Sequence, residues 1–113
     1  MALDEYFATG PLHERPVFET VLARLAPVGE IHVEPVSVGI FLKRARTFAE
    51  LRPMQDWVAV GFSLGRVAHH PLIVRKVVAY PGGRHHVANV RAPDQVDDAL
   101  VELLVEAYRR TPA

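Results

Sequence analysis

The pattern of apolar and polar residues divides the chain into a helix, a run of strands and a closing helix. Apolar residues recur at helical spacing over residues 17–25, which predicts a helix that begins near Arg15 and ends at the proline and glycine that follow. From residue 30 to residue 91, apolar residues instead alternate with polar ones and many are β-branched, which predicts strands. Residues 96–107 return to helical spacing, and Pro93 is expected in the first turn of this second helix.

The strand region divides into segments joined by short connections. We expect strands near residues 30–34, 36–43, 44–52, 57–64, 74–80 and 84–91, with a hairpin turn at Pro81-Gly82-Gly83. Because parallel strands need long crossovers, strands connected in this way pair antiparallel. The sequence therefore predicts a single α+β domain over residues 1–113, with a curled antiparallel sheet of five or six strands and both helices packed on one face.

Composition narrows the function classes. The chain has 113 residues, with 13 lysines and arginines balanced by 13 acids, so no overall charge favours nucleic acid or membrane. The absence of cysteine excludes disulfides, cysteine nucleophiles and thiolate metal sites. The acidic N-terminal residues do not resemble a signal peptide, and no apolar run is long enough to span a membrane. We therefore expect a cytoplasmic protein without a membrane partner.

The sheet face that points away from the helices is predicted to combine aromatic, cationic and small residues. The candidate binding residues on it are Phe41, Lys43, Arg46, Phe48, Arg52 and Trp57, joined from the last hairpin by Arg84 and His86. Aromatic rings offer stacking surfaces, and arginine can hold a phosphate or carboxylate with two parallel N–H groups. This pattern predicts a non-enzymatic binding domain for an anionic ligand, such as a nucleotide, single-stranded nucleic acid or another phosphate or carboxylate.

Two other interpretations fit the same residues. The face could be an interface for a partner protein or for homo-oligomers, or the aromatic residues could form a minor second core whose arginine heads remain in water. The register of the strands decides which residues share the face, because a slip of one residue moves every side chain to the opposite side.

No catalytic, metal or cofactor site is predicted. Residues 61–65 match the Gly-x-Ser-x-Gly pattern of hydrolases, but that motif requires a strand-to-helix turn above a parallel sheet. The pairs His69-His70 and His85-His86 each present at most one ligand to a given face of a strand. No nucleophile, base and orienting group can be assembled from the sequence, so we do not expect an enzyme, a metal site or a cofactor.

Several segments carry a resemblance to a bacterial family, called domain of unknown function 5655, over nearly the whole chain. They are Phe7, Gly10-Pro11, residues 40–44, Arg46-Thr47-Phe48-Ala49, Arg75-Lys76-Val77-Val78, Gly83-Arg84-His85-His86-Val87, residues 92–100 and Glu106-Ala107-Tyr108. Arg84 stands where the family usually has an aromatic or apolar residue. The closing helix is also distantly similar to that of the small YdhG-like and YjbR-like α+β domains. The resemblance supports the fold and its extent, and it implies no activity.

Overall fold

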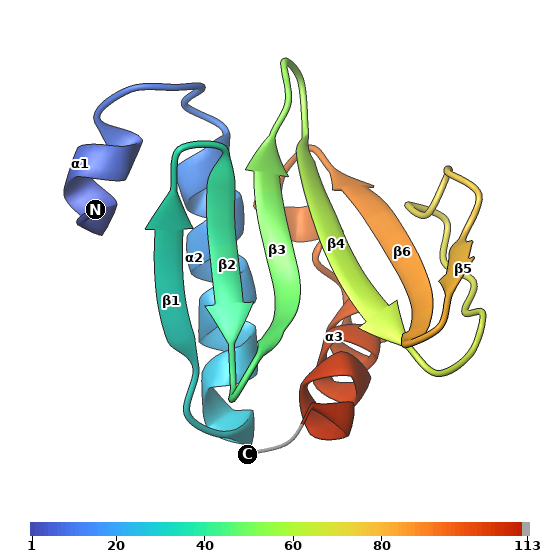
Figure 1. Cartoon of the computed structure of the whole chain (residues 1–113). Helices are drawn as coiled ribbons and strands as arrows, with labels where there is room; N and C mark the ends of the chain where they lie inside the picture. The colour runs from blue at the N-terminus through green and yellow to red at the C-terminus, as the bar shows by residue number, and fades with distance from the viewer. Residues whose placement is uncertain (112–113) are drawn as a thin grey trace.

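A six-stranded antiparallel sheet carries two long helices on one face in the computed structural model, which describes residues 1–111 (Figure 1). The helices are α1 (Leu3–Phe7), α2 (Glu14–Leu25) and α3 (Asp98–Arg110), with short 3-10 turns η1 (Ala26–Val28) and η2 (Pro93–Gln95). The strands are β1 (His32–Val36), β2 (Gly39–Lys43), β3 (Thr47–Pro53), β4 (Val58–Leu64), β5 (Val78–Tyr80) and β6 (Gly83–Val90). They are ordered β1-β2-β3-β4-β6-β5 in an open sheet, which confirms the predicted α+β fold.

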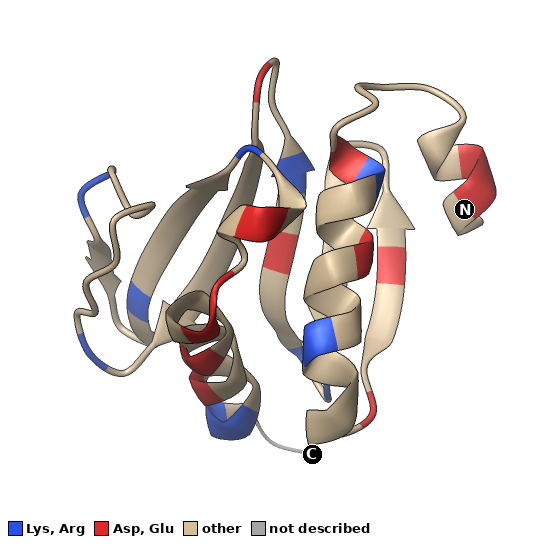
Figure 2. Ribbon diagram, turned by 180° about the vertical axis from the view of Figure 1, so that it is seen from behind, with Lys and Arg blue, Asp and Glu red and all other residues tan. Residues whose placement is uncertain are grey.

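The large apolar side chains of the central strand face the two helices and form the core. Val60 and Phe62 of β4 pack in one cluster with Val21 of α2 and with Leu100 and Leu104 of α3, and all five are at most 1 % exposed. Figure 2 shows α2 and α3 lying side by side across this face of the sheet. Full burial of such a side chain contributes about 1.5–3 kcal/mol, so this layer is the main source of stability.

Two strand boundaries differ from the prediction. Ser37 and Val38 form the turn of a tight hairpin in which Val36 pairs with Gly39, so Val38 is 58 % exposed rather than part of a strand. The strand expected over residues 74–80 is reduced to the three residues of β5, because β6 pairs with only those three. Residues 65–77 therefore form a long loop between β4 and β5 (Figure 1).

The first helix of the structure, α1, was not predicted, since five residues are too few to show helical periodicity. It is tied to α2 by Tyr6, whose Oη donates a hydrogen bond to Glu14 Oε2 at 2.6 Å. Burial raises the pKa of Glu14 above its ordinary value. Across residues 1–111, none of the helices combines the length and the apolar character needed to cross a lipid bilayer.

The closing helix begins later than expected. Pro93 lies in the separate turn η2, and α3 starts after Asp97, whose Oδ1 accepts a hydrogen bond from the backbone N–H of Leu100 at 2.8 Å. This side-chain cap satisfies one of the free N–H groups of the first turn. At the other end, Arg44 Nη1 donates to the carbonyl oxygen of Tyr108 at 3.4 Å.

A β-bulge in β3 changes which face Phe48 occupies. Leu42 of β2 pairs with Ala49, but the next residue, Lys43, pairs with Thr47, so Phe48 is an extra residue in its strand. Its ring is 4 % exposed and meets the ring of Tyr108 edge-on, with centroids 5.2 Å apart. The predicted position of Phe48 on the open face was wrong, because strict alternation cannot anticipate an inserted residue.

The buried layer generates the first prediction. Val60→Asp and Leu100→Asp should each lower the free energy of unfolding by roughly 4 kcal/mol, because both side chains are fully buried and a carboxylate there would have no partner. Urea denaturation followed by circular dichroism measures the effect. Val38→Asp is the matched control and should change stability by less than about 0.5 kcal/mol, since Val38 is exposed. A cooperative, wild-type-like transition for either core variant would contradict the assigned core.

Candidate functional site

Small residues of β4 form the floor of a pocket on the sheet face opposite the helices. Val60 and Phe62 point toward the helices, so Ala59 and Gly61 between them point toward the open face. The pocket above them encloses about 230 Å³. We call it the open-face pocket, and it is lined by Glu50, Arg52, Met54, Ala59, Gly61, Arg75, Lys76, Val78, His85 and Val87. The depression predicted from small residues on this face is therefore present.

Side chains from both neighbouring strands meet above Gly61. A Cβ atom at Gly61 would lie 3.1 Å from Glu50 Cγ and 3.2 Å from His85 Cε1, so only a residue without a side chain leaves this space. Glu50 belongs to β3 and His85 to β6. The Nε atom of Arg52 lies 3.7 Å from Glu50 Oε1, which partly neutralises the carboxylate. The pocket thus holds an imidazole, a carboxylate and a guanidinium close together.

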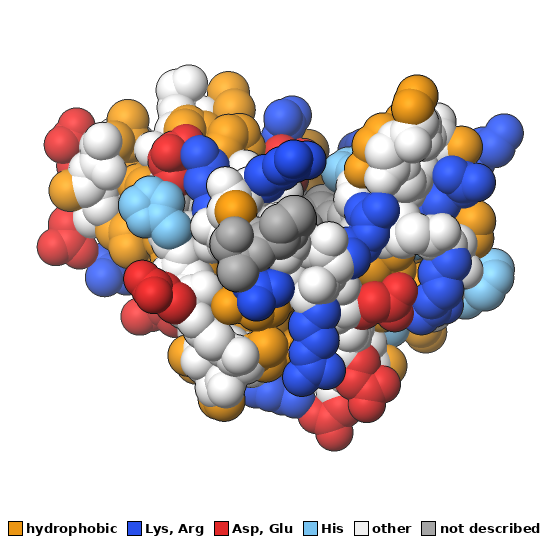
Figure 3. Space-filling view, turned by 60° about the horizontal axis from the view of Figure 1, so that its bottom comes forward, with side chains coloured by type: hydrophobic (Ala, Val, Ile, Leu, Met, Phe, Trp, Pro, Cys, Tyr) orange, Lys and Arg blue, Asp and Glu red, His pale blue; other side chains and the backbone are white. Residues whose placement is uncertain are grey.

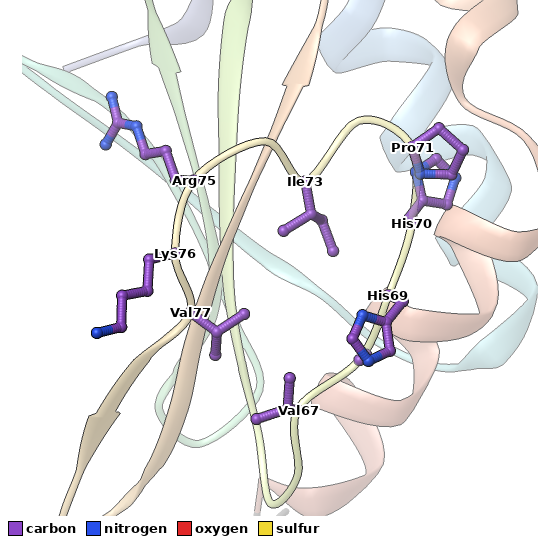
Figure 4. A pocket seen from close by; sticks show the side chains of 9 residues that line it. Val67, His69, His70, Pro71, Ile73, Arg75, Lys76 and Val77 are labelled. Carbon is purple, nitrogen blue, oxygen red and sulfur yellow. The ribbon is translucent and has the colours of Figure 1, made fainter.

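Two further cations reach the pocket from the β4–β5 loop. Arg75 and Lys76 are exposed, and within the described chain neither forms an ion pair. Figure 4 shows both side chains pointing away from the interior of the loop. With Arg52, they give the open-face pocket three permanent cations against the single carboxylate of Glu50.

The interior of the loop is a second, broader depression of about 620 Å³. Its wall is mainly apolar, and Val67, Ile73 and Val77 point into it (Figure 4). Of its two histidines, His69 and His70, the second is already engaged, since Nε2 donates to Asp97 Oδ1 at 2.9 Å and Nδ1 accepts from the backbone N–H of Leu72 at 3.1 Å. Arg75 and Lys76 line both depressions. Only the open-face pocket adds Arg52, Glu50 and His85 to them, so we place the candidate site there.

The buried histidine His86 anchors the start of the loop. Its Nε2 accepts a hydrogen bond from the backbone N–H of Ala68 at 2.9 Å, and its Nδ1 donates to the carbonyl oxygen of Arg84 at 3.0 Å. Its ring is fully buried and stacks on Phe62 with centroids 5.3 Å apart. Burial lowers the pKa of His86, and the hydrogen bond to Arg84 offsets only part of this effect. His86 is thus a neutral structural residue and does not face the open side, contrary to its predicted place.

A second anchor joins the middle of the loop to α3. The carboxylate of Asp97 accepts hydrogen bonds from both Leu100 N–H and His70, and these lower the pKa of Asp97. The two anchors, at Ala68 and at His70, both hold the first half of the loop. Arg75 and Lys76 follow this anchored part of the loop by five and six residues.

The candidate residues from the sequence do not form one cluster. Of the eight, Arg52 alone lines the open-face pocket. Phe41 and Lys43 lie on the same side farther along the sheet, where Lys43 Nζ is 3.0 Å from Glu34 Oε2. Trp57 precedes β4, and its ring lies 5.2 Å from the guanidinium carbon of Arg91. The predicted stacking surface of Phe41, Phe48 and Trp57 is therefore not assembled.

The two remaining candidates lie at one end of the sheet. Arg46 is exposed in the β2–β3 turn, and Arg84 is opposite Leu64 at the start of β6.

The charged and titratable pocket residues that were not predicted from the sequence are Glu50, His85, Arg75 and Lys76. The alternation expected over residues 44–52 puts Glu50 on the same face as Arg52. Nothing in the sequence, however, indicated that the β4–β5 loop would bring Arg75 and Lys76 to this face.

The first four residues of the Gly-x-Ser-x-Gly segment lie in β4 and Gly65 follows it in a loop, so the segment is not on a strand-to-helix turn. Ser63 is paired in register with His85, yet its Oγ accepts a hydrogen bond from Tyr80 Oη at 2.7 Å. No hydrogen bond joins Ser63 to His85 among the residues described. The arrangement does not supply an activated serine, which requires a base within hydrogen-bond reach. Nor do residues 1–111 bring three potential metal ligands of the His, Cys, Asp or Glu type together.

Comparison with known proteins gives one match. The model of a family described as "Domain of unknown function (DUF5655)" matches residues 3–111. A search of the curated proteins and a search of the solved structures each find no match. The further likeness to YdhG-like and YjbR-like domains stays a prediction.

The buried histidine generates a pH prediction. Because the pKa of His86 is lowered in the folded protein, the unfolded chain binds the extra proton, and the stability from neutral His86 is present above about pH 6.5 and is lost as the pH falls. His86→Leu should cost roughly 1–3 kcal/mol at pH 7, since Ala68 N–H loses its acceptor.

Urea denaturation of both proteins from pH 8 to pH 5 tests this prediction. The stability difference between wild type and His86→Leu should shrink as the pH falls below about 6.5, because only the wild type loses the histidine contribution. A difference that stays constant over this interval would show that the folded and unfolded chains bind the proton of His86 equally, and so that its pKa is not lowered.

Proposed function

The chain belongs to the DUF5655 family, whose description assigns no function, and we propose that its open-face pocket binds a small anionic ligand. The observation that carries this proposal is the pair Arg75 and Lys76, which project over a floor of Ala59 and Gly61 and have no carboxylate partner in the described structure. Charged groups in this setting favour a phosphate or a carboxylate, because both match the N–H donors of arginine and lysine.

The size and lining of the pocket narrow the ligand. Its volume of about 230 Å³ is below the roughly 300–1,000 Å³ of drug-sized sites, so a small metabolite fits better than an extended one. Glu50 and His85 lie at the floor, where they can accept or share a hydrogen bond from a hydroxyl or amine of the ligand. The ligand class is therefore a small phosphate or carboxylate that also carries a hydrogen-bond donor.

This proposal retains the binding function expected from the sequence and changes the residues that perform it. Arg52 keeps its role, whereas Trp57 and the phenylalanines no longer supply stacking. A protein interface on the same face remains the competing function, and charge reversal of the loop distinguishes it from anion binding.

Charge reversal of the loop tests the proposal. Titration calorimetry with inorganic phosphate, citrate and adenosine monophosphate should detect at least one ligand, with affinity that falls as salt is added. The double variant Arg75→Glu, Lys76→Glu should lose this binding and keep the wild-type melting temperature, because exposed unpaired cations contribute little to stability. Arg91→Glu makes the same kind of reversal outside the pocket and should retain binding.

Two outcomes would overturn the proposal. One is that none of the three anions binds the wild-type protein. The other is that light scattering finds a wild-type oligomer that dissociates in the double variant, which would assign the face to an interface.

The floor of the pocket gives an independent test that leaves every charge in place. Gly61→Ala should weaken anion binding, because the new methyl group would lie within 3.2 Å of Glu50 Oε1 and His85 Cε1 and push these side chains apart. The free energy of unfolding should change by less than about 1 kcal/mol, since the displaced atoms belong to flexible side chains. Gly65→Ala is the matched control, because its added methyl would meet only Arg110 Nε, at 4.0 Å. Undiminished binding by Gly61→Ala would show that the ligand does not reach the floor.

A further inference from the structure

Five arginines gather at the end of the sheet where α3 finishes, and we call this surface the basic end. They come from the β2–β3 turn, the start of β6 and the last turn of α3, and they are Arg44, Arg46, Arg84, Arg109 and Arg110. Figure 3 brings this end of the molecule forward and shows Lys and Arg side chains spread across it. None of the five lines the open-face pocket.

Hydrogen bonds join the three segments into one surface. Arg44 Nη1 donates to the carbonyl oxygens of Tyr108 and Thr111, at 3.4 and 3.0 Å, which ties the β2–β3 turn to the end of α3. Arg110 Nη2 donates to the carbonyl oxygen of Gly82 at 2.8 Å, which ties the same helix end to the β5–β6 turn. The segments are far apart in sequence, and these contacts fix their positions relative to one another.

The positive charge at the basic end is larger than nearby acidic groups and the end of α3 balance. Within the described chain none of the five arginines forms an ion pair, whereas the neighbouring Lys43 and Arg66 are paired with Glu34 and Glu106. Three acidic residues lie near this end: Glu30, whose backbone carbonyl accepts a hydrogen bond from Tyr108 Oη, and Glu102 and Glu106, which lie beside Arg109 and Arg110 on α3. Because Glu106 is paired with Arg66, these acids leave most of the five charges unbalanced. A helix C-terminus contributes only about half a negative charge, so capping α3 does not account for five guanidinium groups.

We propose that the basic end binds the phosphodiester backbone of nucleic acid. All five cations are arginines, whose planar groups can hold phosphate oxygens in pairs, and they are spread over three segments as successive phosphates along a strand would require. An anionic membrane would favour apolar anchors beside the charges. Of the exposed large apolar side chains in the described chain, Tyr80 lies beside the basic end, where it pairs with Gly83. Its hydroxyl is already bonded to Ser63, and a single tyrosine is a weak membrane anchor.

The binding measurement uses a short fluorescein-labelled oligonucleotide, both as a single strand and as the duplex of the same sequence. Fluorescence anisotropy reports binding at salt concentrations between about 50 and 200 mM. For at least one of the two probes, the logarithm of the binding constant should fall linearly with the logarithm of the salt concentration. Arg46→Glu and Arg109→Glu should each weaken binding by roughly tenfold, the loss expected for one charge-assisted hydrogen bond. Each should also lower the salt slope by about 0.7 for the single strand or 0.9 for the duplex. Both residues are exposed and their side chains form no hydrogen bond among residues 1–111, so the fold should be unchanged.

The control is Arg91→Glu, which reverses the same charge just beyond the opposite end of β6 and should retain nearly wild-type affinity. Arg46→Glu should also leave the open-face pocket able to bind its small anion, so failure of one proposal does not imply failure of the other. Absence of nucleic-acid binding by the wild type would overturn the proposal. Equal losses for Arg46→Glu and Arg91→Glu would do so as well, because net charge alone would then explain the effect. Binding to phosphatidylglycerol vesicles without binding to either oligonucleotide would assign the basic end to a membrane surface instead.

Discussion

The central strand β4 is packed on both sides, and its two sets of side chains have to satisfy different neighbours. Val58, Val60 and Phe62 meet the helices and supply volume to the core. Ala59 and Gly61 alternate with them and leave space on the other face, where a larger residue would collide with Glu50 and His85. Because side chains alternate strictly along a strand, the same seven residues that hold α2 and α3 in place also create the floor of the open-face pocket.

Two adjacent histidines of β6, His85 and His86, have unrelated roles, and His86 anchors the long β4–β5 loop. His86 points into the core, where it accepts the Ala68 N–H, while His85 points to the open face and lines the pocket. A buried backbone N–H without an acceptor is costly, so the neutral histidine determines where the loop starts. Asp97, which accepts the hydrogen bond from His70 at the second anchor, also caps α3 by accepting the Leu100 N–H. The pocket cations Arg75 and Lys76 thus follow a loop whose first half is held by the core and by the start of the closing helix.

The sequence contained enough information for the fold, and less for the site. Periodicity located α2, α3 and the strand region, because a helix stripe and a strand alternation are local properties. The bulge at Phe48 and the turn at Ser37-Val38 depend on pairing with a neighbouring strand, which no local pattern records. The place of Arg75 and Lys76 at the pocket depends on the path of the long β4–β5 loop, which no local pattern records. The candidate residues were therefore of the right chemical kind, but only Arg52 was placed in the pocket.

Overall neutrality is a poor guide to what this surface binds. The chain carries equal numbers of acidic and basic side chains, yet many of the acids lie on α1, η2 and α3, as Figure 2 shows. Charges separated by more than about 8 Å of physiological solution are largely screened from one another. A carboxylate on α1 or η2, at the other end of the molecule, therefore does little to weaken the unpaired arginines of the basic end, and a bound anion responds mainly to the charges that touch it. For the same reason the open-face pocket and the basic end act as separate electrostatic sites, one shaped as a small cavity and the other as an extended surface.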